Sequence, residues 1–336
     1  MQTLIVTGAA GFIGSNFVRY MLQKYPDYRI IVLDALTYAG NLDNLKDVWS
    51  NPNFTFIKGD IRDAAIVNNL AQNADAIINF AAETHVDRSI IEPGAFLQTD
   101  VAGTWVLLEA ARQHNLDRIL HISTDEVYGS IDVGSFQETD ILEPSSPYSA
   151  SKAGAEHMVG AYHKTYGVPT IVTRGSNNFG PYHYPEKLIP LFITNLIDDQ
   201  PVPVYGDGQQ VRDWMYVLDH CAGIDIALHH GQPGQTYNVG GGNERANMDV
   251  VKLILHALNK PDSLIRYVTD RPGHDRRYSI DCSKIAALGY KPGATFEDRI
   301  AETVQWYVSN QDWWRAIKEK QRDYKDFMQK WYADRQ

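Results

Sequence analysis

The sequence predicts an α/β protein with a doubly wound parallel sheet and a smaller α+β C-terminal domain. Short, β-rich apolar runs alternate with amphipathic stretches up to about residue 174, and this rhythm then breaks. The runs are TLIVTG (3–8), RIIVLD (29–34), FTFIKGD (54–60), AIINFAA (76–82), RILHIST (118–124) and PTIVTR (169–174). Apolar strands joined by helices are typical of a parallel sheet that is covered on both faces.

The second half has a different composition. Proline and glycine cluster in GPYHYPEK, QPVPVYGDGQ, GQPGQ and RPGH, and the strand-like runs become shorter. We therefore expect a first domain at residues 1–175 and a second at 176–336. Helical patterns at 219–229 and near 247–258 are long enough to pack on the sheet, so parts of the second half are expected to return to the first domain.

Composition narrows the class of protein. The formal net charge of −10 argues against a nucleic-acid binder, which would normally be basic. The two cysteines, Cys221 and Cys282, form no disulfide framework, and no residue set has the spacing of a metal site. Neither a signal peptide nor an apolar run of about 18 residues is recognisable, which predicts a cytoplasmic protein with no membrane partner.

A glycine loop follows the first predicted strand. TGAAGFIG places Gly8, Gly11 and Gly14 where that strand turns into a helix, a context that favours binding of a pyrophosphate at the helix N-terminus. Asp34 ends the second strand and suits an adenosine ribose, whereas it would repel a 2′-phosphate, so NAD is favoured over NADP. Asp60 follows the third strand, and we place it near the adenine. These features predict a Rossmann-like domain that binds NAD.

The motif YSASK supplies a candidate base. Tyr148 and Lys152 are four residues apart and therefore lie on one face of a helix. A nearby ammonium favours the phenolate, so we expect Lys152 to lower the pKa of Tyr148 and make it a base for a sugar hydroxyl. Alone, this pair would be read as an exposed helix pair; the glycine loop favours the catalytic interpretation.

Two adjacent acids follow the apolar run RILHIS. Thr124, Asp125 and Glu126 stand at the end of a predicted buried strand, where unpaired charge is costly. Neighbouring strand residues point to opposite faces, so the chain must leave strand geometry near Thr124 if both acids are to reach one substrate. Gly129 permits such a bend. Adjacent carboxyls in a low-dielectric site have pKa values that are pushed apart, which yields one acid and one base.

These motifs carry a family resemblance. TGAAGFIG, Asp34, NFAAETHVD (79–87) and YSASK resemble the extended short-chain dehydrogenase/reductase superfamily over essentially the whole chain. STDEVYG, SNNFGPYHYPEKLIP (176–190) and DRPGHDRRY (270–278) closely resemble the dTDP-glucose 4,6-dehydratases. One departure is Ala9-Ala10, where that family often has two glycines; alanine is tolerable if neither position needs a positive φ.

The resemblance implies a hydro-lyase reaction on dTDP-glucose, with NAD retained through each cycle. Tyr148 would take the C4 hydroxyl proton while hydride leaves C4 for NAD⁺, and Thr124 would hydrogen-bond the C4 oxygen. Glu126 would remove the C5 proton, and protonated Asp125 would protonate the departing C6 hydroxyl. Hydride would then return to C6 and give dTDP-4-keto-6-deoxyglucose.

The resemblance also implies binding residues and a homodimer, in which the helical segments 100–113 and 150–166 form the interface. The cofactor-binding set is Gly8, Gly11, Phe12, Ile13, Gly14, Asp34, Asp60, Ile61, Ala81, Ala82, Thr99, Tyr148, Lys152 and Asn178. The substrate-binding set is Thr84, Thr124, Asp125, Glu126, Asn177, Lys187, Leu188, Pro203, Tyr205, Arg212, Asn247, Arg271, His274 and Tyr332. Arginine forks among them suit diphosphate oxygens.

The motifs leave other activities open. A nucleotide-sugar 4-epimerase would need neither an acid at C6 nor a base at C5, so Asp125 and Glu126 disfavour it. A 4,6-dehydratase acting on a UDP-, CDP- or GDP-hexose is not distinguished by these motifs. A non-catalytic NAD-binding scaffold is less favoured, because Tyr148, Lys152 and both acids are present.

Overall fold

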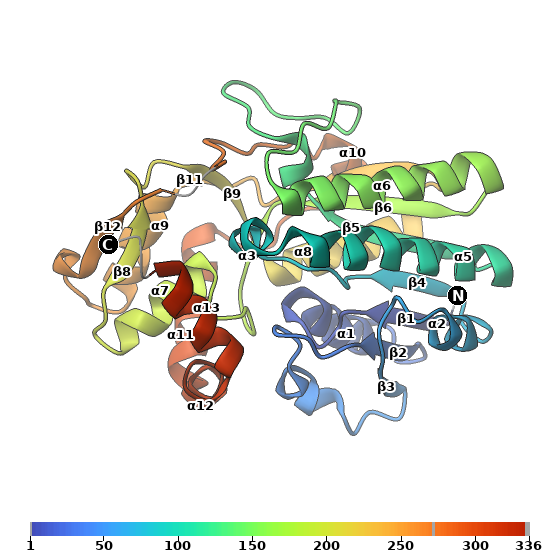
Figure 1. The fold of residues 1–336 in the computed structure, drawn as a ribbon, viewed down its shortest axis with the longest axis horizontal. Coiled ribbons are helices and arrows are strands. Elements are labelled where there is room, and N and C mark those ends of the chain that lie inside the picture. The colour runs from blue at the N-terminus through green and yellow to red at the C-terminus, as the bar shows by residue number, and fades with distance from the viewer. Residues whose placement is uncertain (1, 271–272, 333–336) are drawn as a thin grey trace.

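A seven-stranded parallel sheet forms the larger part of the molecule (Figure 1). The computed structural model describes residues 2–270 and 273–332, apart from the side chains of residues 320, 323 and 332. The strand order is β10-β6-β5-β4-β1-β2-β3, the order of a doubly wound sheet extended by one strand. The strands are β1 (Thr3–Thr7), β2 (Arg29–Asp34), β3 (Phe54–Lys58), β4 (Ala76–Asn79), β5 (Arg118–Thr124), β6 (Thr170–Gly175) and β10 (Gln235–Val239). The predicted fold class is therefore confirmed.

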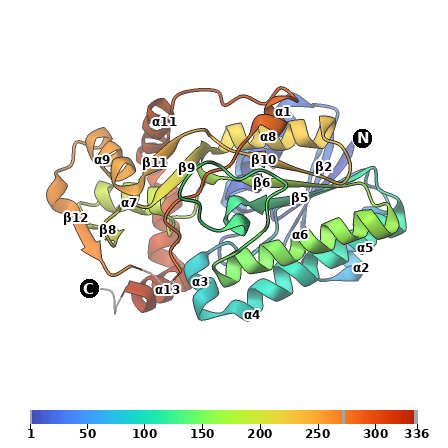
Figure 2. The ribbon, with the colours of Figure 1, turned by 90° about the horizontal axis from the view of Figure 1, so that it is seen from above.

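Helices cover both faces of this sheet, as Figure 2 shows from above. One face packs on α1 (Phe12–Lys24) and α8 (Val217–His230), and the other on α2 (Ala64–Ala71), α5 (Thr104–His114) and α6 (Pro147–Tyr166). Alternate residues of each strand supply the two cores; in β1, Leu4 and Val6 face α1 while Ile5 faces α5. This two-sided burial explains why the strands are apolar throughout.

A second unit lies beside the carboxyl ends of the large sheet (Figure 1). It contains a three-stranded sheet, a two-stranded sheet and three helices around their own apolar core. The strands are β7 (Asn177–Phe179), β8 (Val202–Tyr205), β9 (Val211–Tyr216), β11 (Glu244–Ala246) and β12 (Ile265–Val268), and the helices are α7 (Leu188–Ile197), α9 (Asn247–Ala257) and α11 (Phe296–Ser309). Shorter elements are η1 (Leu42–Val48), α3 (Val86–Ile91), α4 (Pro93–Phe96), η2 (Leu97–Gly103), η3 (Asp125–Tyr128), η4 (Asp262–Leu264) and α10 (Ser283–Ala286).

Two segments beyond residue 175 return to the large sheet. Strand β10 pairs with β6, and α8 packs beside α1 on the sheet face. Helix α9 instead belongs to the core of the second unit. Pairing across some 60 residues of sequence explains why a single cut in the chain separates the two units only in part.

Helices α1 and α8 are joined by a buried carboxylate. Asp225 lies 2.6 Å from Lys24 Nζ and 2.7 Å from His229 Nδ1, and it accepts a hydrogen bond from Tyr25 at 3.0 Å. Burial by itself raises the pKa of this carboxyl, but the hydrogen bonds from His229 and Lys24 outweigh it and lower the pKa. A lowered pKa means that the ionised carboxylate stabilises the fold at pH values above about 4.

Replacing Asp225 by alanine is expected to lower the free energy of unfolding by about 3 kcal/mol at pH 7, because it leaves buried donors without their acceptor. The loss should shrink as the pH falls through the lowered pKa of Asp225, where the wild-type carboxyl is itself protonated. Urea unfolding at neutral and acidic pH measures both quantities. Asp47→Ala is the matched control, because Asp47 pairs with Arg19 but is 53% exposed, so about 0–1 kcal/mol is expected. Equal losses in the two variants would contradict the assignment.

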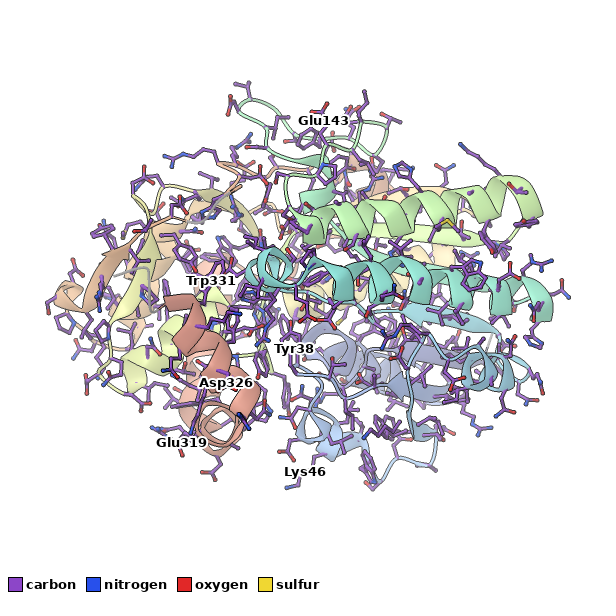
Figure 3. All side chains as sticks on the ribbon, in the orientation of Figure 1. Tyr38, Lys46, Glu143, Glu319, Asp326 and Trp331 are labelled. Atoms are coloured by element: carbon purple, nitrogen blue, oxygen red, sulfur yellow. The ribbon has the colours of Figure 1, made fainter. Side chains whose placement is uncertain are left out.

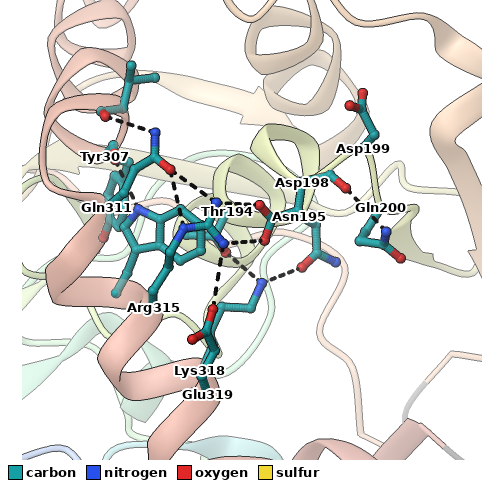
Figure 4. Close-up of polar contacts among 12 residues, drawn as sticks. Thr194, Asn195, Asp198, Asp199, Gln200, Tyr307, Gln311, Arg315, Lys318 and Glu319 are labelled. Atoms are coloured by element: carbon teal, nitrogen blue, oxygen red, sulfur yellow. Dashed lines mark hydrogen bonds and ion pairs between the residues drawn. The ribbon is translucent and has the colours of Figure 1, made fainter.

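The tryptophan-rich C-terminal segment docks on the second unit. It comprises α12 (Gln311–Arg315), η5 (Ala316–Lys320) and α13 (Arg322–Tyr332). Trp314 is fully buried in the core of that unit. Figure 4 shows polar contacts of the same segment with α7 and the residues after it: Arg315 pairs with Asp198 at 2.6 Å, and Lys318 donates to Asn195 at 2.9 Å. Among the described residues, no helix is long and apolar enough to cross a membrane.

Candidate active site

A cavity of about 530 Å³ opens at the carboxyl ends of the parallel strands, where the two units meet. Residues that directly follow β1, β2, β4, β5 and β6 line one side of it, and residues of β8, β9, α7 and α9 line the other. Tyr38 and Trp331, labelled in Figure 3, lie at this junction. Open α/β sheets bind ligands at this edge.

All the described residues of the predicted binding sets line this cavity. On the side of the large sheet these are Gly8, Gly11, Phe12, Ile13, Gly14, Asp34, Asp60, Ile61, Ala81, Ala82, Thr84, Thr99, Thr124, Asp125, Glu126, Tyr148 and Lys152. On the other side they are Asn177, Asn178, Lys187, Leu188, Pro203, Tyr205, Arg212, Asn247 and His274. Arg271 lies outside the described residues, and so does the side chain of Tyr332. The structure thus brings the set together, while the individual roles stay predictions.

The glycine loop packs closely against backbone atoms, which leaves no room for side chains at two of its glycines. Gly8 has a φ of +67°, and a Cβ atom there would lie 2.6 Å from the backbone nitrogen of Ala81. A Cβ atom on Gly14 would lie 2.7 Å from the Cα atom of Ala9. Ala9 and Ala10 are buried, and neither has a positive φ, so alanine is tolerated at both departures from the family pattern.

The residues at this end of the cavity fit a dinucleotide. Helix α1 begins after Gly11, and no side chain caps its first turn, which leaves backbone N–H groups to bind an anion. Asp34 is held by hydrogen bonds from the backbone nitrogens of Ala10 and Leu36, both at 2.8 Å. Each carboxylate oxygen keeps a further lone pair for a ribose hydroxyl. Asp60 pairs with Arg62 at 2.6 Å, which lowers its pKa.

The chain leaves strand geometry at Thr124, as the adjacent acids require. Strand β5 ends at Thr124, and the 3₁₀ turn η3 begins at Asp125. Thr124 caps this turn by accepting a hydrogen bond from the backbone nitrogen of Glu126 at 3.2 Å. Gly129 ends the turn with a φ of +83°, where a Cβ atom would lie 2.6 Å from the carbonyl oxygen of Glu143. The turn places both acids in the wall of one cavity.

The two acids have different surroundings. Asp125 is 2% exposed, whereas Glu126 is half-buried. Burial, and then the charge of Glu126, raise the pKa of Asp125 well above its usual value, although Arg212 acts in the opposite direction. Asp125 Oδ2 has no protein partner within the described part of the chain. Asp125 is therefore suited to hold a proton at neutral pH and to donate it into the cavity.

The start of α6 positions Tyr148. Ser146 and Ser149 form a reciprocal capping box, and Pro147 occupies the first helical position, so the helix begins there. Tyr148 is then in the first turn. Lys152 lies one turn later on the same face, where its ammonium donates to the backbone oxygen of Ile122 at 2.7 Å. The bond anchors this face of α6 to β5.

The expectation that Lys152 lowers the pKa of Tyr148 is wrong for the protein alone. Burial, followed by the charges of Glu126 and Asp100, raises the pKa of Tyr148 well above its ordinary value. Burial also lowers the pKa of Lys152, against the opposing charge of Asp100. The sequence motif gives the separation of Tyr148 and Lys152 but contains neither the burial nor the acids that outweigh the ammonium.

Cations line the opposite side of the cavity. Lys187 donates to the backbone oxygen of Thr84 at 2.8 Å, and Arg212 lies over the ring of Tyr278 at 4.1 Å while donating to the backbone oxygen of Asp275. His274 lies 2.6 Å from Asp270. Lys187 and Arg212 are cations in a chain whose net charge is −10, so their grouping favours an anionic ligand.

Sequence reasoning missed several residues of the cavity. Glu83, Ser123, Glu186, Trp214, His220 and Tyr278 all line it. Glu186 and Tyr278 belong to motifs quoted above, so the sequence could have predicted that they line the cavity. His220 is different, because only the return of α8 to the sheet places its ring 3.1 Å from Asn178. Its Nε2 atom is buried without a partner among the described residues. Within those residues, no group of three or more His, Cys, Asp or Glu side chains could hold a metal ion.

Comparison with known proteins places the chain in a family. Residues 5–303 match the family model for GDP-mannose 4,6 dehydratase. A dTDP-glucose 4,6-dehydratase of an Actinoplanes species is 51% identical over 93% of this chain and 99% of its own length. DesIV, the dTDP-glucose 4,6-dehydratase of Streptomyces venezuelae solved with NAD bound, superposes with a TM-score of 0.92, at 50% identity over 94% of this chain and all of its own.

A UDP-glucuronic acid 4-epimerase from Bacillus cereus has a similar fold, with a TM-score of 0.87, but only 28% identity over 92% of this chain and 99% of its own. The shared fold therefore extends to a neighbouring activity, whereas sequence identity of about one half is found with the dehydratases. The chain belongs to the dTDP-glucose 4,6-dehydratase family of the extended short-chain dehydrogenase/reductase superfamily.

Proposed function

We propose that this protein catalyses the NAD-dependent 4,6-dehydration of dTDP-glucose to dTDP-4-keto-6-deoxyglucose. The observation that carries the proposal is the pair Asp125 and Glu126, which a 3₁₀ turn presents to the same cavity as Tyr148. An epimerase needs no such acid and base. Family membership and the fit of the glycine loop to a dinucleotide support NAD as the cofactor.

Each residue is assigned one proton. NAD, which the glycine loop and Asp34 would hold, would supply the acceptor for the C4 hydride and the donor of the hydride to C6. Tyr148, as phenolate, takes the C4 hydroxyl proton, and Thr124 hydrogen-bonds the C4 oxygen. Glu126 removes the C5 proton, which the C4 ketone makes acidic, while Asp125 protonates the leaving C6 hydroxyl and releases water. Glu126 then returns its proton to C5.

The proton balance requires one further transfer. After the last step Tyr148 holds a proton that it did not hold at the start, and Asp125 lacks one. The hydroxyl of Thr124 contacts both groups: it lies 3.3 Å from Asp125 Oδ1 and hydrogen-bonds Tyr148. Transfer of a proton from Tyr148 to Asp125 through this hydroxyl restores both residues.

We assign the two units to the two ligands. Residues 1–175, together with β10 and α8, bind NAD and carry the catalytic residues. Most of residues 176–336 bind the nucleotide sugar, with Lys187, Arg212 and His274 near the diphosphate. The cations of the cavity support this assignment, and resemblance supports the choice of thymine over other bases.

We propose that the protein is a cytoplasmic homodimer, paired through α5 and α6 with the segment before α5. Large apolar side chains are exposed on these elements: Leu97, Trp105 and Tyr166 are 57%, 47% and 56% exposed. Scattered apolar residues are normal on a surface, but a group on adjacent helices favours a partner. Two cysteines without a disulfide fit the reducing cytoplasm.

Proton NMR of the purified protein with dTDP-glucose in deuterated water, without added NAD, tests the function. A 4-keto-6-deoxy product with solvent deuterium at C5 is expected, because Glu126 exchanges its proton with the solvent. A galacto-configured product without C5 deuterium would establish an epimerase instead. Absence of any reaction, repeated with UDP-, CDP- and GDP-glucose, would favour the non-catalytic scaffold.

A further inference from the structure

A third acid lies behind the catalytic tyrosine and has no part in the mechanism above. Asp100 is 1% exposed and belongs to the π-helical segment η2, which follows α4 and leads into α5. Its Oδ2 atom accepts a hydrogen bond from the hydroxyl of Ser151 at 2.6 Å, and its Oδ1 atom accepts one from the backbone nitrogen of Glu83 at 2.9 Å. Asp100 thus joins α6 to the loop after β4.

Both contacts lead directly to the active site. Ser151 precedes Lys152, and its hydroxyl also donates to the backbone oxygen of Tyr148 at 2.8 Å. Glu83 lines the cavity, and so does Thr99, the residue before Asp100. A π-helical turn inside a helical stretch is found frequently at functional sites, where it redirects one side chain. Here it brings a carboxyl group to Ser151, whose hydroxyl also bonds the backbone oxygen of Tyr148.

The charge of Asp100 acts on both members of the tyrosine–lysine pair. It raises the pKa of Lys152 and also raises the pKa of Tyr148. Burial raises the pKa of Asp100 itself to about 6. The charge of Lys152 and the hydrogen bonds from Ser151 and the backbone of Glu83 act to lower this pKa. The carboxyl of Glu83 is a second nearby acid, whose own pKa is raised by burial and by Asp100.

We propose that Asp100 is a positioning residue of the C4 oxidation step: it fixes the turn of α6 that carries Tyr148 and Lys152, and its negative charge sets the pH range in which this pair works. The inference rests on the proposed function, because it assigns Asp100 to the step that Tyr148 begins. Asp100 itself contacts neither reacting atom and acts through Ser151, Lys152 and the loop at Glu83.

Two substitutions separate the charge from the hydrogen bonds. Asp100→Asn removes the charge but keeps both contacts, since the amide oxygen accepts from Glu83 and the amide nitrogen donates to the oxygen of Ser151. Ser151→Ala removes one hydrogen bond and keeps the charge. Asp117→Asn, at an exposed residue before β5, is the matched control for loss of a negative charge.

The test is the pH profile of C4 oxidation in the holoenzyme, followed in single turnovers by the absorbance of reduced nicotinamide. Both Tyr148 and Lys152 should titrate at lower pH in Asp100→Asn, so its profile should move to lower pH by about one unit. The profiles of wild type and variant should converge below about pH 6, where wild-type Asp100 is protonated. Ser151→Ala should lower the rate, because the turn loses a hydrogen bond, but keep the pH dependence of the wild type above pH 7. Asp117→Asn should keep both the rate and the pH dependence throughout.

A profile of Asp100→Asn that superposes on that of the wild type would overturn the proposal, as would an equal displacement in Ser151→Ala. If Asp100→Asn does not fold, Ser151→Ala still decides. Loss of its hydrogen bond raises the pKa of Asp100, so its profile should depart from the wild-type profile just above pH 6. Agreement of the two profiles there would then count against the proposal.

Thermal unfolding gives a readout that does not require activity. Because the folded pKa of Asp100 is raised, ionisation of Asp100 costs stability between about pH 4 and pH 6. Asparagine has no such cost, so the Tm of Asp100→Asn minus that of wild type should increase across this range. A constant difference would contradict a buried, titrating Asp100. If the Tm difference changes with pH as expected but the wild type does not convert dTDP-glucose, the proposed function is wrong. The burial and titration of Asp100 would nevertheless be supported.

Discussion

Replacing Glu126 by glutamine is expected to stop the reaction after C4 oxidation and to lower kcat by about 10²–10⁴-fold, the usual contribution of a general base. Glutamine has nearly the same size and keeps the geometry of the 3₁₀ turn, but it cannot take the C5 proton. The hydride that has left C4 then has no C6 acceptor. Reduced nicotinamide should therefore accumulate on the enzyme when dTDP-glucose is added.

Deuterium incorporation distinguishes the two acids. In deuterated water, Glu126→Gln should leave the C5 hydrogen of the bound 4-ketone unexchanged. Asp125→Asn is the matched variant: it keeps the base and loses the acid, so C5 should still exchange with solvent while C6 dehydration is slowed by about 10²–10⁴-fold. Exchange at the wild-type rate in Glu126→Gln, with exchange lost in Asp125→Asn, would reverse the two roles.

The local surroundings support this order of roles. Asp125 is buried, and after burial the charge of Glu126 raises its pKa further, which favours the protonated form of Asp125. Glu126 is half-buried, so a proton on its carboxyl can exchange with the solvent. Asp125 and Glu126 carry the same functional group, but they differ in burial. This difference suits Asp125 to act as the acid and Glu126 to act as the base.

The large sheet could be predicted because its information is local. β2 and β5 have the boundaries of the runs RIIVLD and RILHIST, since two-sided burial makes the whole strand apolar. The seventh strand, β10, was not predicted. Its sequence QTYNV is short and half polar, and it becomes a strand by pairing with β6 after a long connection. Pairing with β6 makes this segment a strand, and no local sequence pattern predicts that pairing.

The cavity lining was predicted where a motif carries it. Gly8, Asp34, Tyr148 and Lys152 are spaced by strand and helix geometry, so their convergence follows from the fold class. Residues such as His220 and Asp100 lie outside these spacings. His220 reaches Asn178 only through the packing of α8, and Asp100 reaches Ser151 only through the π-helical turn of η2.

Electrostatics was the least predictable property of the site. The separation of four residues in YSASK places an ammonium near Tyr148, and this alone favours a lowered pKa. Burial and the charges of Glu126 and Asp100, which no local spacing encodes, give the opposite sign. The protein alone therefore holds Tyr148 protonated. Bound NAD⁺ would add a positive charge, which would favour the phenolate if the nicotinamide lies near Tyr148.

Tyr148→Phe tests whether Tyr148 is the base of C4 oxidation. Phenylalanine keeps the ring in the first turn of α6 but removes the only proposed acceptor of the C4 hydroxyl proton, so C4 oxidation should fall by about 10²–10⁴-fold. Unlike Glu126→Gln, this variant should accumulate no reduced nicotinamide when dTDP-glucose is added.

The pH dependence identifies the group that has been removed. In wild type the rate of C4 oxidation should rise with pH, because the raised pKa of Tyr148 limits the fraction of phenolate. Glu126→Gln removes the strongest of the neighbouring charges that raise this pKa, so its first half-reaction should reach its plateau at lower pH than in wild type. The residual rate of Tyr148→Phe should lose the rising limb. If that limb persists, another group is the base. That group, and not Tyr148, would then have to supply the proton that passes through Thr124 to Asp125.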